Sequence, residues 1–186
     1  MKILVSQNAP TNLSAYTSLS EKYGVEFDFK PFFLIQPLSD KEFRAQRINL
    51  QDYTAVIFSS RHAIDAYFKL CEMTRFKVPD TMKYFCTTEV IAMYLQKHIV
   101  YRKRKVFFGN GTPESDFNLI TAKHQGEKFL ITTAEGAKID PLTSLFDSKK
   151  LDYSVGVLVK PVSQDLKSVD IVNYDFVVLY NPSDVK

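Results

Sequence analysis

Short uninterrupted blocks of apolar residues recur along this chain, and most are followed by a segment with helical spacing. In the segment 61–75, Ile64, Tyr67, Phe68 and Cys71 fall on one face of a helix. Strands are expected at 2–6, 54–60, 82–88, 105–109, 127–134, 153–162 and 174–180, and helices at 13–23, 40–47, 61–75, 89–99 and 140–149. Continuous apolar strands that alternate with helices are typical of a mostly parallel sheet covered on both faces.

Several helix ends carry their own local signals. Thr11 or Asn12 can cap the first helix, and Gly24 is expected to end it. Farther along, Thr112 is a suitable N-cap for a helix that begins with Pro113. The extended stretch 25–39 is interrupted by prolines at 31 and 37, which restricts it to an edge strand or a linker.

The number of strands predicts an α/β fold of two flavodoxin-like parallel-sheet domains joined by two extended linker strands. One domain is expected to be discontinuous, with residues 1–34 and 160–186, and the other to be the inserted segment 40–156. The linker strands are then 35–39 and 157–159.

Small polar residues follow five of the apolar blocks. They are Ser6 and Gln7, Ser59 and Ser60, Thr87 and Thr88, Thr132 and Thr133, and Asn181, Pro182 and Ser183. Ser, Thr and Asn are also the ordinary N-caps of helices, so each pair alone has a purely structural interpretation. Ligands of open α/β sheets bind at the carboxyl ends of the strands, where helix N-termini favour anions. Together the five sites predict a cleft between the two domains for a molecule with several carboxylates or phosphates.

Composition and charge narrow the choice of function. The 186 residues are 45% hydrophobic and 24% charged, as expected for a globular chain, and the formal net charge is +3. Such a mild positive charge suits a small anion but is too weak to indicate a nucleic-acid partner. No apolar run is long enough to span a membrane and the first residues do not form a signal sequence, so a cytoplasmic location is expected.

Several common catalytic motifs are missing from the sequence. There is no glycine-rich nucleotide fingerprint and no nucleophile elbow. His62, His98 and His124 lack metal-ligand spacing, and Cys71 and Cys86 are too far apart for a paired cysteine motif. An enzyme of this sequence is therefore expected to work without metal, nucleotide or covalent intermediate.

The run "YRKRK" at 101–105 is the strongest basic cluster in the chain. It can protect a strand edge from pairing with other chains, or it can attract an anionic substrate. Aromatic residues for stacking bases are not interleaved with it, which disfavours binding of single-stranded nucleic acid.

Three segments resemble the uroporphyrinogen-III synthase family: "YTAVIFSSRHAIDAYF", "VGVLVKPVSQDL" and "YDFVVLYNPSDV". The resemblance extends over the whole chain in order and includes the inserted-domain arrangement. It implies a cofactor-free lyase that folds and closes hydroxymethylbilane, a linear tetrapyrrole with carboxylates on every ring, while inverting ring D. Relative to the family the chain stops early, so the terminal domain of this chain is expected to be incomplete at its C-terminus.

The resemblance also assigns substrate-binding positions at polar strand ends, namely Ser59, Ser60, Thr87, Thr88, Thr133, Asn181 and Ser183. The strand-end pattern adds Ser6 and Gln7 as further substrate-binding candidates. Three positions depart from the family pattern: Val159 stands where a crossover strand carries a tyrosine, Pro161 replaces a nearby threonine, and Ile91 replaces another threonine. Valine cannot donate a proton to the departing hydroxyl, so Tyr180 is the candidate for that catalytic role.

Two functions remain open at this point, and a third ranks below them. The first is the synthase, acting as a monomer, with hydroxymethylbilane synthase as a candidate partner that hands over the substrate. The second is a catalytically weakened synthase-like domain that binds a polycarboxylate tetrapyrrole, which the three departures favour. A flavodoxin-like receiver or sugar-binding module ranks last, because a receiver needs acidic residues at the strand ends and these are Ser, Thr and Asn.

Overall fold

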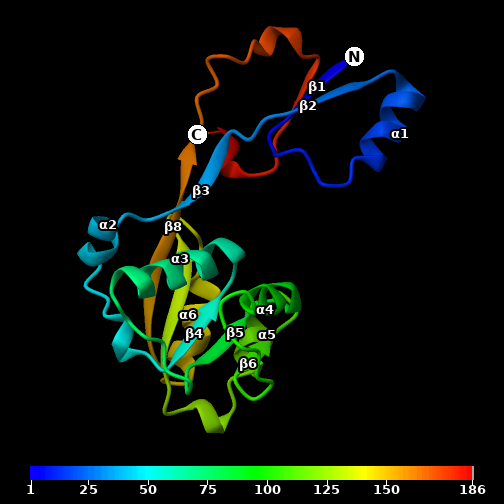
Figure 1. The fold of residues 1–186 in the computed structure, drawn as a ribbon. Coiled ribbons are helices and arrows are strands. Elements are labelled where there is room, and N and C mark those ends of the chain that lie inside the picture. Colours follow the sequence, from blue (N-terminus) through cyan, green and yellow to red (C-terminus); the bar gives the residue numbers. More distant parts are fainter. Residues whose placement is uncertain (186) are drawn as a thin grey trace. The chain divides into compact units, whose positions relative to one another are not determined.

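The structure is a computed structural model that describes the backbone of residues 1–185 and all of their side chains except those of Phe117, Pro182 and Ser183. Contacts between residues divide the chain into two compact units (Figure 1). The terminal unit consists of Met1–Ile35 and Pro161–Lys186, and the central unit consists of Gln36–Lys160. Each unit is described separately below.

The terminal unit is built on a three-stranded sheet in which the strand order is β2-β1-β9. Strand β1 (Lys2–Val5) pairs in parallel with both β2 (Glu26–Phe29) and β9 (Phe176–Val178). The helix α1 (Ser14–Tyr23) connects β1 to β2, and short 3-10 helices lie at Ile171–Asn173 and Pro182–Val185. The two ends of the chain therefore meet in one sheet, because β1 and β9 are neighbours.

Helix α1 ends at Gly24 as predicted, whereas its N-cap is Leu13, which makes no side-chain cap, and neither Thr11 nor Asn12 occupies that position. The side chain of Asn12 accepts a hydrogen bond from the backbone N–H of Ser14 at 2.9 Å. At the other end Gly24 adopts a left-handed conformation with φ of 63°, and its N–H donates to Ser20 O at 2.9 Å. A side chain would be strained in that conformation, which explains why a glycine ends the helix.

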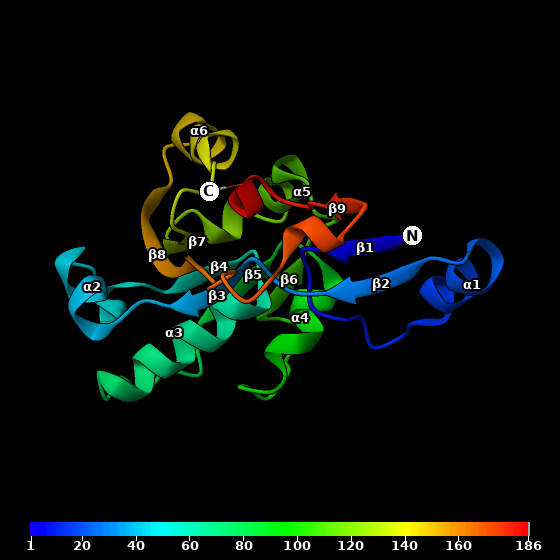
Figure 2. The same cartoon turned by 90° about the horizontal axis from the view of Figure 1, so that it is seen from above.

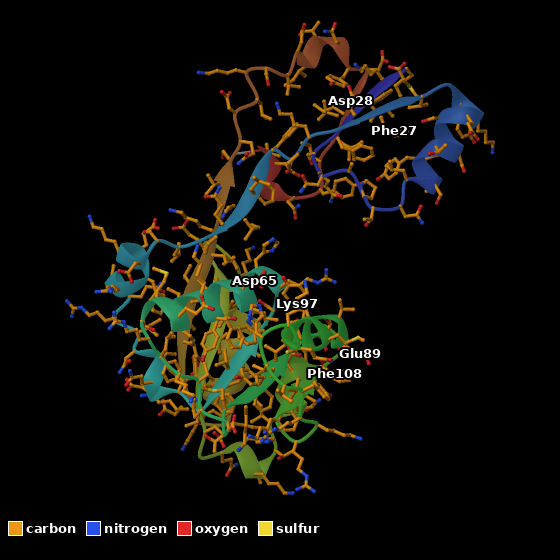
Figure 3. The ribbon with its side chains drawn as sticks, in the orientation of Figure 1. Phe27, Asp28, Asp65, Glu89, Lys97 and Phe108 are labelled. Atoms are coloured by element: carbon orange, nitrogen blue, oxygen red, sulfur yellow. The ribbon has the colours of Figure 1, made fainter. Side chains whose placement is uncertain are left out.

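Strand β2 has one aromatic face and one polar face. The rings of Phe27 and Phe29 meet the ring of Tyr16 on α1 edge to face, at 5.0 and 4.9 Å between centroids. Asp28 lies between them in sequence, so it points to the opposite face, where it pairs with Lys2 and accepts a hydrogen bond from Tyr174 (Figure 3). Helix α1 is therefore attached to the sheet by aromatic contacts.

The central unit contains the larger sheet, with six strands in the order β3-β8-β7-β4-β5-β6. The strands are β3 (Phe33–Pro37), β4 (Ala55–Phe58), β5 (Lys83–Cys86), β6 (Val106–Phe108), β7 (Lys128–Ala134) and β8 (Asp152–Ser163). The five strands from β4 to β8 pair in parallel. Hydrogen bonds from Leu38 N to Leu158 O and from Gln164 N to Phe32 O run in the opposite sense, so β3 is an antiparallel edge strand. Both β3 and β8 continue from one unit into the other.

Helices cover both faces of this sheet. They are α2 (Asp40–Ala45), α3 (Arg61–Met73), α4 (Glu89–Leu95), α5 (Pro113–Asn118) and α6 (Asp140–Ser148), with 3-10 turns at Leu50–Asp52 and Ala122–His124. Figure 2 shows α3 and α4 on one face of the sheet and α5 and α6 on the other. The predicted parallel sheet with two covered faces is confirmed for this unit.

The strand order differs from the flavodoxin-like order that we expected. Numbered from β4, the parallel strands follow the order 3-2-1-4-5, whereas the flavodoxin-like order is 2-1-3-4-5. The difference arises because β7 pairs with β4, so that β5 and β6 continue outward on the other side. Both orders produce the same alternation of strands and helices along the chain, so the hydrophobic pattern cannot distinguish them.

Phenylalanine rings form the core between the sheet and α6. Phe129 on β7 is fully buried and lies 5.6 Å from the ring of Phe85 and 5.2 Å from the ring of Phe146. Ala55, Ile57 and Ile131 belong to the same cluster. Because this core touches three neighbouring strands and a helix, it holds the ends of those strands in register.

The replacement Phe129→Ala is expected to lower the free energy of unfolding by about 3–5 kcal/mol, because it leaves a large cavity among rings that cannot close it. Urea denaturation followed by circular dichroism measures this loss. The control Val172→Ala removes atoms from a side chain that is 92% exposed and should change stability by less than about 0.5 kcal/mol. A loss below about 1 kcal/mol for Phe129→Ala would contradict the rigid core described here.

Candidate functional site

The register of the central sheet brings the polar strand ends into one row. Phe58 on β4 is level with Cys86 on β5, which is level with Phe108 on β6. The next residues are Ser59, Thr87 and Gly109, and hydrogen bonds from Thr87 N to Phe58 O and from Gly109 N to Cys86 O extend the pairing to them. Three adjacent strands therefore end together, at the same edge of the sheet.

The point where the strand order reverses lies between β4 and β7. From β4 the chain continues to β5 and β6 on one side, while β7 and β8 lie on the other. Crevices at such reversal points are the usual ligand sites of open α/β sheets. Here Ser59 and Ser60 follow β4 and the exposed turn of Glu135 and Gly136 follows β7, so the predicted pair Ser59–Ser60 occupies the favoured position.

Ser60 and Thr88 act as N-caps. The Ser60 hydroxyl accepts a hydrogen bond from Ala63 N at 3.1 Å, which caps α3, and the Thr88 hydroxyl accepts from Ile91 N at 3.4 Å, which caps α4. The structural interpretation that sequence analysis left open therefore accounts for these two residues. Ser59 is exposed and Thr87 half-buried, and within residues 1–185 neither hydroxyl has a hydrogen-bond partner. Those two hydroxyls remain free to bind a ligand.

Arg61 adds a positive charge to this edge, and sequence reasoning had not singled it out. It is the first residue of α3, directly after the cap, and its guanidinium lies 5.4 Å from the centroid of the Tyr94 ring. Contact with an aromatic face holds the side chain while leaving its N–H donors available. The signal that could have identified it is its position beside the serine pair at a strand end.

The loop between β6 and α5 is stiffened by its own side chains. Ser115 accepts a hydrogen bond from Asn110 N at 3.0 Å and donates one to Thr112 O at 2.9 Å. Ser115 N in turn donates to the Thr112 hydroxyl at 3.2 Å, which confirms Thr112 as the predicted cap before Pro113. Because Asn110 also bridges to Thr88, this loop is joined to the end of β5.

Asp116 is a buried carboxyl group behind that loop, and sequence reasoning did not identify it. The residue is 5% exposed, and Oδ1 has no hydrogen-bond partner among the described residues. Burial raises the pKa of Asp116 from its ordinary value of 3.8 to about 6. Gly109 makes room for it, because a Cβ at position 109 would lie 2.4 Å from Asp116 Oδ1. Acidic residues are common in the first turn of a helix, so the sequence gives no indication that this one is buried.

Thr133 lies within the sheet, in contrast to its predicted exposure at the strand end. The residue is 6% exposed and its hydroxyl reaches only Ala134 O, at 3.4 Å. Strand β7 runs to Ala134, so Thr133 is still a strand residue. By alternation it points to the same face as Ile131, which belongs to the core. The neighbouring Thr132 is also buried and donates to Ile57 O at 2.6 Å.

The terminal unit has a separate small pocket at the carboxyl end of its own sheet. Its volume is about 300 Å³, and its lining includes the predicted residues Ser6, Gln7 and Asn181 together with Phe33. Gln7 and Asn181 are exposed and can present their amides to a ligand. The predicted residue Ser183 has a side chain that lies outside the described ones.

Ser6 cannot donate to a ligand, because its hydroxyl already donates a hydrogen bond to Asp184. Ser6 is 4% exposed and donates to Asp184 Oδ2 at 2.8 Å. The same oxygen accepts from Tyr180 N at 2.8 Å and Asn181 N at 2.9 Å. Burial opposes ionisation of Asp184, but these hydrogen bonds outweigh it and keep its pKa below the ordinary value. Asp184, which sequence reasoning missed, therefore holds the loop after β9 against the end of β1.

Tyr180 is half exposed at the end of this strand. Interaction with the Tyr180 side chain raises the pKa of Tyr16 on α1 above its ordinary value. The position of Tyr180 is compatible with the catalytic role expected of it, which stays a prediction.

Three residues depart from the family pattern, and the structure buries their apolar side chains fully or in part. Val159 is 2% exposed in β8, and Ile91 is 9% exposed in α4. Pro161 lies half-buried, also on β8. None of these positions supplies a hydroxyl, so any proton donor must lie elsewhere.

Within residues 1–185, no three His, Cys, Asp or Glu side chains are grouped so that they could hold a metal ion. Among the described helices, none is long and apolar enough to cross a membrane.

Comparison with known proteins identifies the family. The family model of uroporphyrinogen-III synthase HemD matches residues 14–158 of this chain, which is more than half of its length. The chain belongs to the uroporphyrinogen-III synthase family. The family resemblance predicted from the three sequence segments is therefore confirmed. A comparison with curated proteins gave no match.

Solved structures of uroporphyrinogen-III synthases share the fold. A mutant enzyme from the extremely thermophilic bacterium Thermus thermophilus is similar with a TM-score of 0.62 and 13% identity, over 88% of this chain and 63% of that one. The enzyme from Helicobacter pylori gives a TM-score of 0.57 and 15% identity, over 99% of this chain and 75% of that one. The chain thus spans less than two thirds of the Thermus protein. Mixed α/β architecture with parallel sheets is common to this chain and the family.

The replacement Asp116→Asn is expected to change how stability depends on pH. Below pH 3.8 the carboxyl group is protonated in both the folded and the unfolded protein, so it has no effect. Between 3.8 and about 6 only the unfolded chain loses its proton, and stability falls as pH rises. Above that range the penalty is constant, on the order of 1–3 kcal/mol. Urea denaturation at pH 4 and pH 7 should show this fall in the wild type and lose it in Asp116→Asn. An identical pH dependence in both proteins would contradict the raised pKa.

Ser59 and Ser60 are expected to respond differently to replacement by alanine. Ser60→Ala should lower the free energy of unfolding by about 1 kcal/mol, because α3 loses its cap. Ser59→Ala should change it by less than about 0.5 kcal/mol, because its exposed hydroxyl has no partner to lose. Thermal or urea denaturation of the two variants makes the comparison. Equal losses would mean that Ser59 is also structural.

Proposed function

We propose that the protein is a uroporphyrinogen-III synthase, which closes hydroxymethylbilane into a ring while inverting ring D and needs no cofactor. The observation that carries the proposal is the free Ser59 hydroxyl at the strand-order reversal of a chain of this family. Because the chain spans only part of its solved relatives, the activity is proposed for the full-length protein.

The substrate explains why uncharged donors gather at the strand ends. Hydroxymethylbilane carries carboxylates on every ring, and a carboxylate binds well to hydroxyls, amides and backbone N–H groups. Ser59 and Thr87 offer hydroxyls, Arg61 offers a charged donor, and the first N–H groups of α3 add a partial positive charge. In the terminal unit Gln7 and Asn181 offer amides beside the small pocket.

Orientation supplies most of the catalysis in this proposal. The pyrrole rings are reactive in their own right, so the protein must hold the chain in a bent conformation that favours the spiro route over direct closure. Loss of the terminal hydroxyl benefits from a proton donor, whose absence costs about 10²–10⁴-fold in rate. Val159 cannot be this donor, and we assign the role to the Tyr180 hydroxyl.

The second candidate is a catalytically weakened synthase-like domain that binds a polycarboxylate tetrapyrrole. The buried apolar side chains of Val159 and Ile91 favour it, because these positions carry hydroxyl groups in the family pattern. Binding donors at the strand ends are compatible with both candidates.

The proposal also includes the domain boundaries, the oligomeric state, the cellular location and a partner protein. We infer that the domains are residues 1–34 with 160–186 and residues 40–156, with linkers at 35–39 and 157–159, close to the contact units. We further propose a cytoplasmic monomer that receives hydroxymethylbilane from hydroxymethylbilane synthase.

The full-length protein is expected to convert hydroxymethylbilane mainly into the III isomer, whereas spontaneous closure gives the I isomer. Chromatography of the oxidised products measures the isomer ratio. If only the I isomer forms while uroporphyrinogen still binds, the weakened-domain proposal replaces the synthase. If neither turnover nor binding is found, both proposals fail.

The replacement Tyr180→Phe is expected to lower the rate of III-isomer formation by about 10²-fold or more, because it removes the proton donor and leaves the ring. Tyr23→Phe is the matched control, since Tyr23 is an exposed tyrosine at the end of α1 in the same unit. An unchanged rate for Tyr180→Phe would exclude Tyr180 from the mechanism without affecting the assignment of the reaction.

A further inference from the structure

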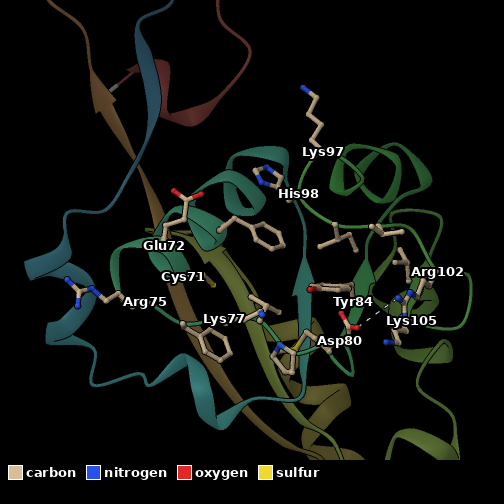
Figure 4. A pocket seen from close by; sticks show the side chains of 18 residues that line it. Cys71, Glu72, Arg75, Lys77, Asp80, Tyr84, Lys97, His98, Arg102 and Lys105 are labelled. Atoms are coloured by element: carbon tan, nitrogen blue, oxygen red, sulfur yellow. Dashed lines mark ion pairs between the residues drawn. The ribbon is translucent and has the colours of Figure 1, made fainter.

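The central unit contains a cavity of about 720 Å³ at the amino ends of β5 and β6, opposite to the strand ends described above. Its walls come from the end of α3, the segment 75–82 that leads into β5, and the segment 97–106 that leads into β6 (Figure 4). Ligand sites in proteins are typically about 300–1,000 Å³. The cavity therefore has the volume of a site for a small organic molecule.

One wall of the cavity is apolar and firmly held. The ring of His98 stacks on the ring of Phe68 at 4.6 Å, with only 3° between the planes. Asp65 fixes this stack, because it accepts hydrogen bonds from His98 Nε2 at 2.9 Å and from the Tyr94 hydroxyl at 2.7 Å. Tyr84 and Met82 are buried beneath the same surface. A ligand would meet a pre-formed apolar wall.

Positive side chains gather around this wall. Lys77, Arg102 and Lys105 line the cavity, and Figure 4 shows Arg102 and Lys105 together on the side of Asp80, whereas Arg75 and Lys97 extend outward. The ammonium groups of Lys77 and Lys105 make no ion pair or hydrogen bond with any residue of the described chain.

Acidic residues compensate these cations only in part. The carboxylates in the lining are Glu72 and Asp80. Asp80 lies 3.9 Å from Arg102 and its side chain is 90% exposed, so this ion pair is weak. Five cations against two carboxylates leave a net positive charge at the cavity.

A turn selects which residues of the basic run face the cavity. Lys105 N and Val106 N both donate to Arg102 O, at 2.8 and 3.2 Å. This turn brings Arg102 and Lys105 to the same side, and both line the cavity, whereas Lys103 and Arg104 do not. Two of the four basic residues of the run therefore belong to the cavity rather than to the surrounding surface.

We propose that this cavity binds a small organic anion with an apolar, preferably aromatic, body and two or more phosphate or carboxylate groups. The body packs against the wall formed by Phe68, His98 and Tyr84, and the anionic groups take the place of Asp80 beside Arg102, Lys105 and Lys77. Without such a ligand, Lys77 and Lys105 have no charged partner among the described residues, and Arg102 has only the exposed Asp80. The site is separate from the strand-end site and does not depend on the synthase activity.

The test measures binding to the full-length protein by isothermal titration calorimetry. ADP probes phosphates on an aromatic body, benzenetricarboxylate probes carboxylates on an aromatic body, and pyrophosphate probes anionic groups without a body. At least one of the two aromatic probes is expected to bind with a Kd below about 1 mM, and pyrophosphate at least about tenfold more weakly. The aromatic probe that binds more tightly identifies phosphate or carboxylate as the preferred group.

Two double variants locate the binding. R102E/K105E should weaken it at least about tenfold, because both anion contacts are reversed. K103E/R104E changes the net charge of the same run equally and should weaken binding less than about threefold, since these side chains do not line the cavity. A second pair of variants lies outside the basic run 101–105, in case R102E/K105E does not fold. Lys77→Gln should weaken binding, and Lys69→Gln, at an exposed position of α3, is its control.

Three results would overturn the proposal. The first is that neither aromatic probe binds. The second is that both double variants, or both lysine variants, weaken binding equally, which would indicate only general attraction to a basic surface. The third is that pyrophosphate binds as tightly as the better of the two aromatic probes, which would leave the apolar wall without a role.

Discussion

Parallel pairing of β4 with β5 and β7 is the constraint on which the rest of the structure depends. Because the five strands from β4 to β8 are parallel, their carboxyl ends lie at one edge of the central sheet and their amino ends at the other. The strand-end hydroxyls, the cap of α3 and the buried Asp116 all belong to the first edge. The cavity with its basic lining belongs to the second. One register therefore separates two chemically different surfaces, and the fully buried ring of Phe129 maintains it.

Much of the fold could be predicted from the sequence, because the relevant signals are local. Uninterrupted apolar blocks identified the parallel strands of the central sheet, and Gly24 and Thr112 marked helix ends as expected. Strand order could not be predicted in the same way. Whether β7 lies beside β4 or beside β6 depends on packing between segments that are far apart in the chain. The alternation of strands and helices along the chain is the same in both arrangements.

The candidate site was predictable only in outline. Ser59 and Ser60 look equivalent in the sequence, yet Ser60 caps α3 while Ser59 has no partner among the described residues. The same residue types serve both roles, since a hydroxyl that accepts from a helix N–H can equally bind a ligand. Asp116 and Asp184 were missed because burial, which decides their behaviour, results from loops that fold back on distant strands. Thr133 is buried rather than exposed because β7 extends one residue beyond it, and its substrate-binding role stays a prediction.

The contact between Gly109 and Asp116 has a consequence for how this loop can change over time. A Cβ at position 109 would lie 2.4 Å from both Asp116 Oδ1 and Ser115 Oγ, so that position tolerates substitution only after both side chains have moved away or become smaller. Position 109 is thus epistatic with positions 115 and 116, and the order in which changes arise is constrained by geometry. A lineage that first shortened residues 115 and 116 would open this loop to new side chains at the end of β6, whereas one that kept the serine and the aspartate would not.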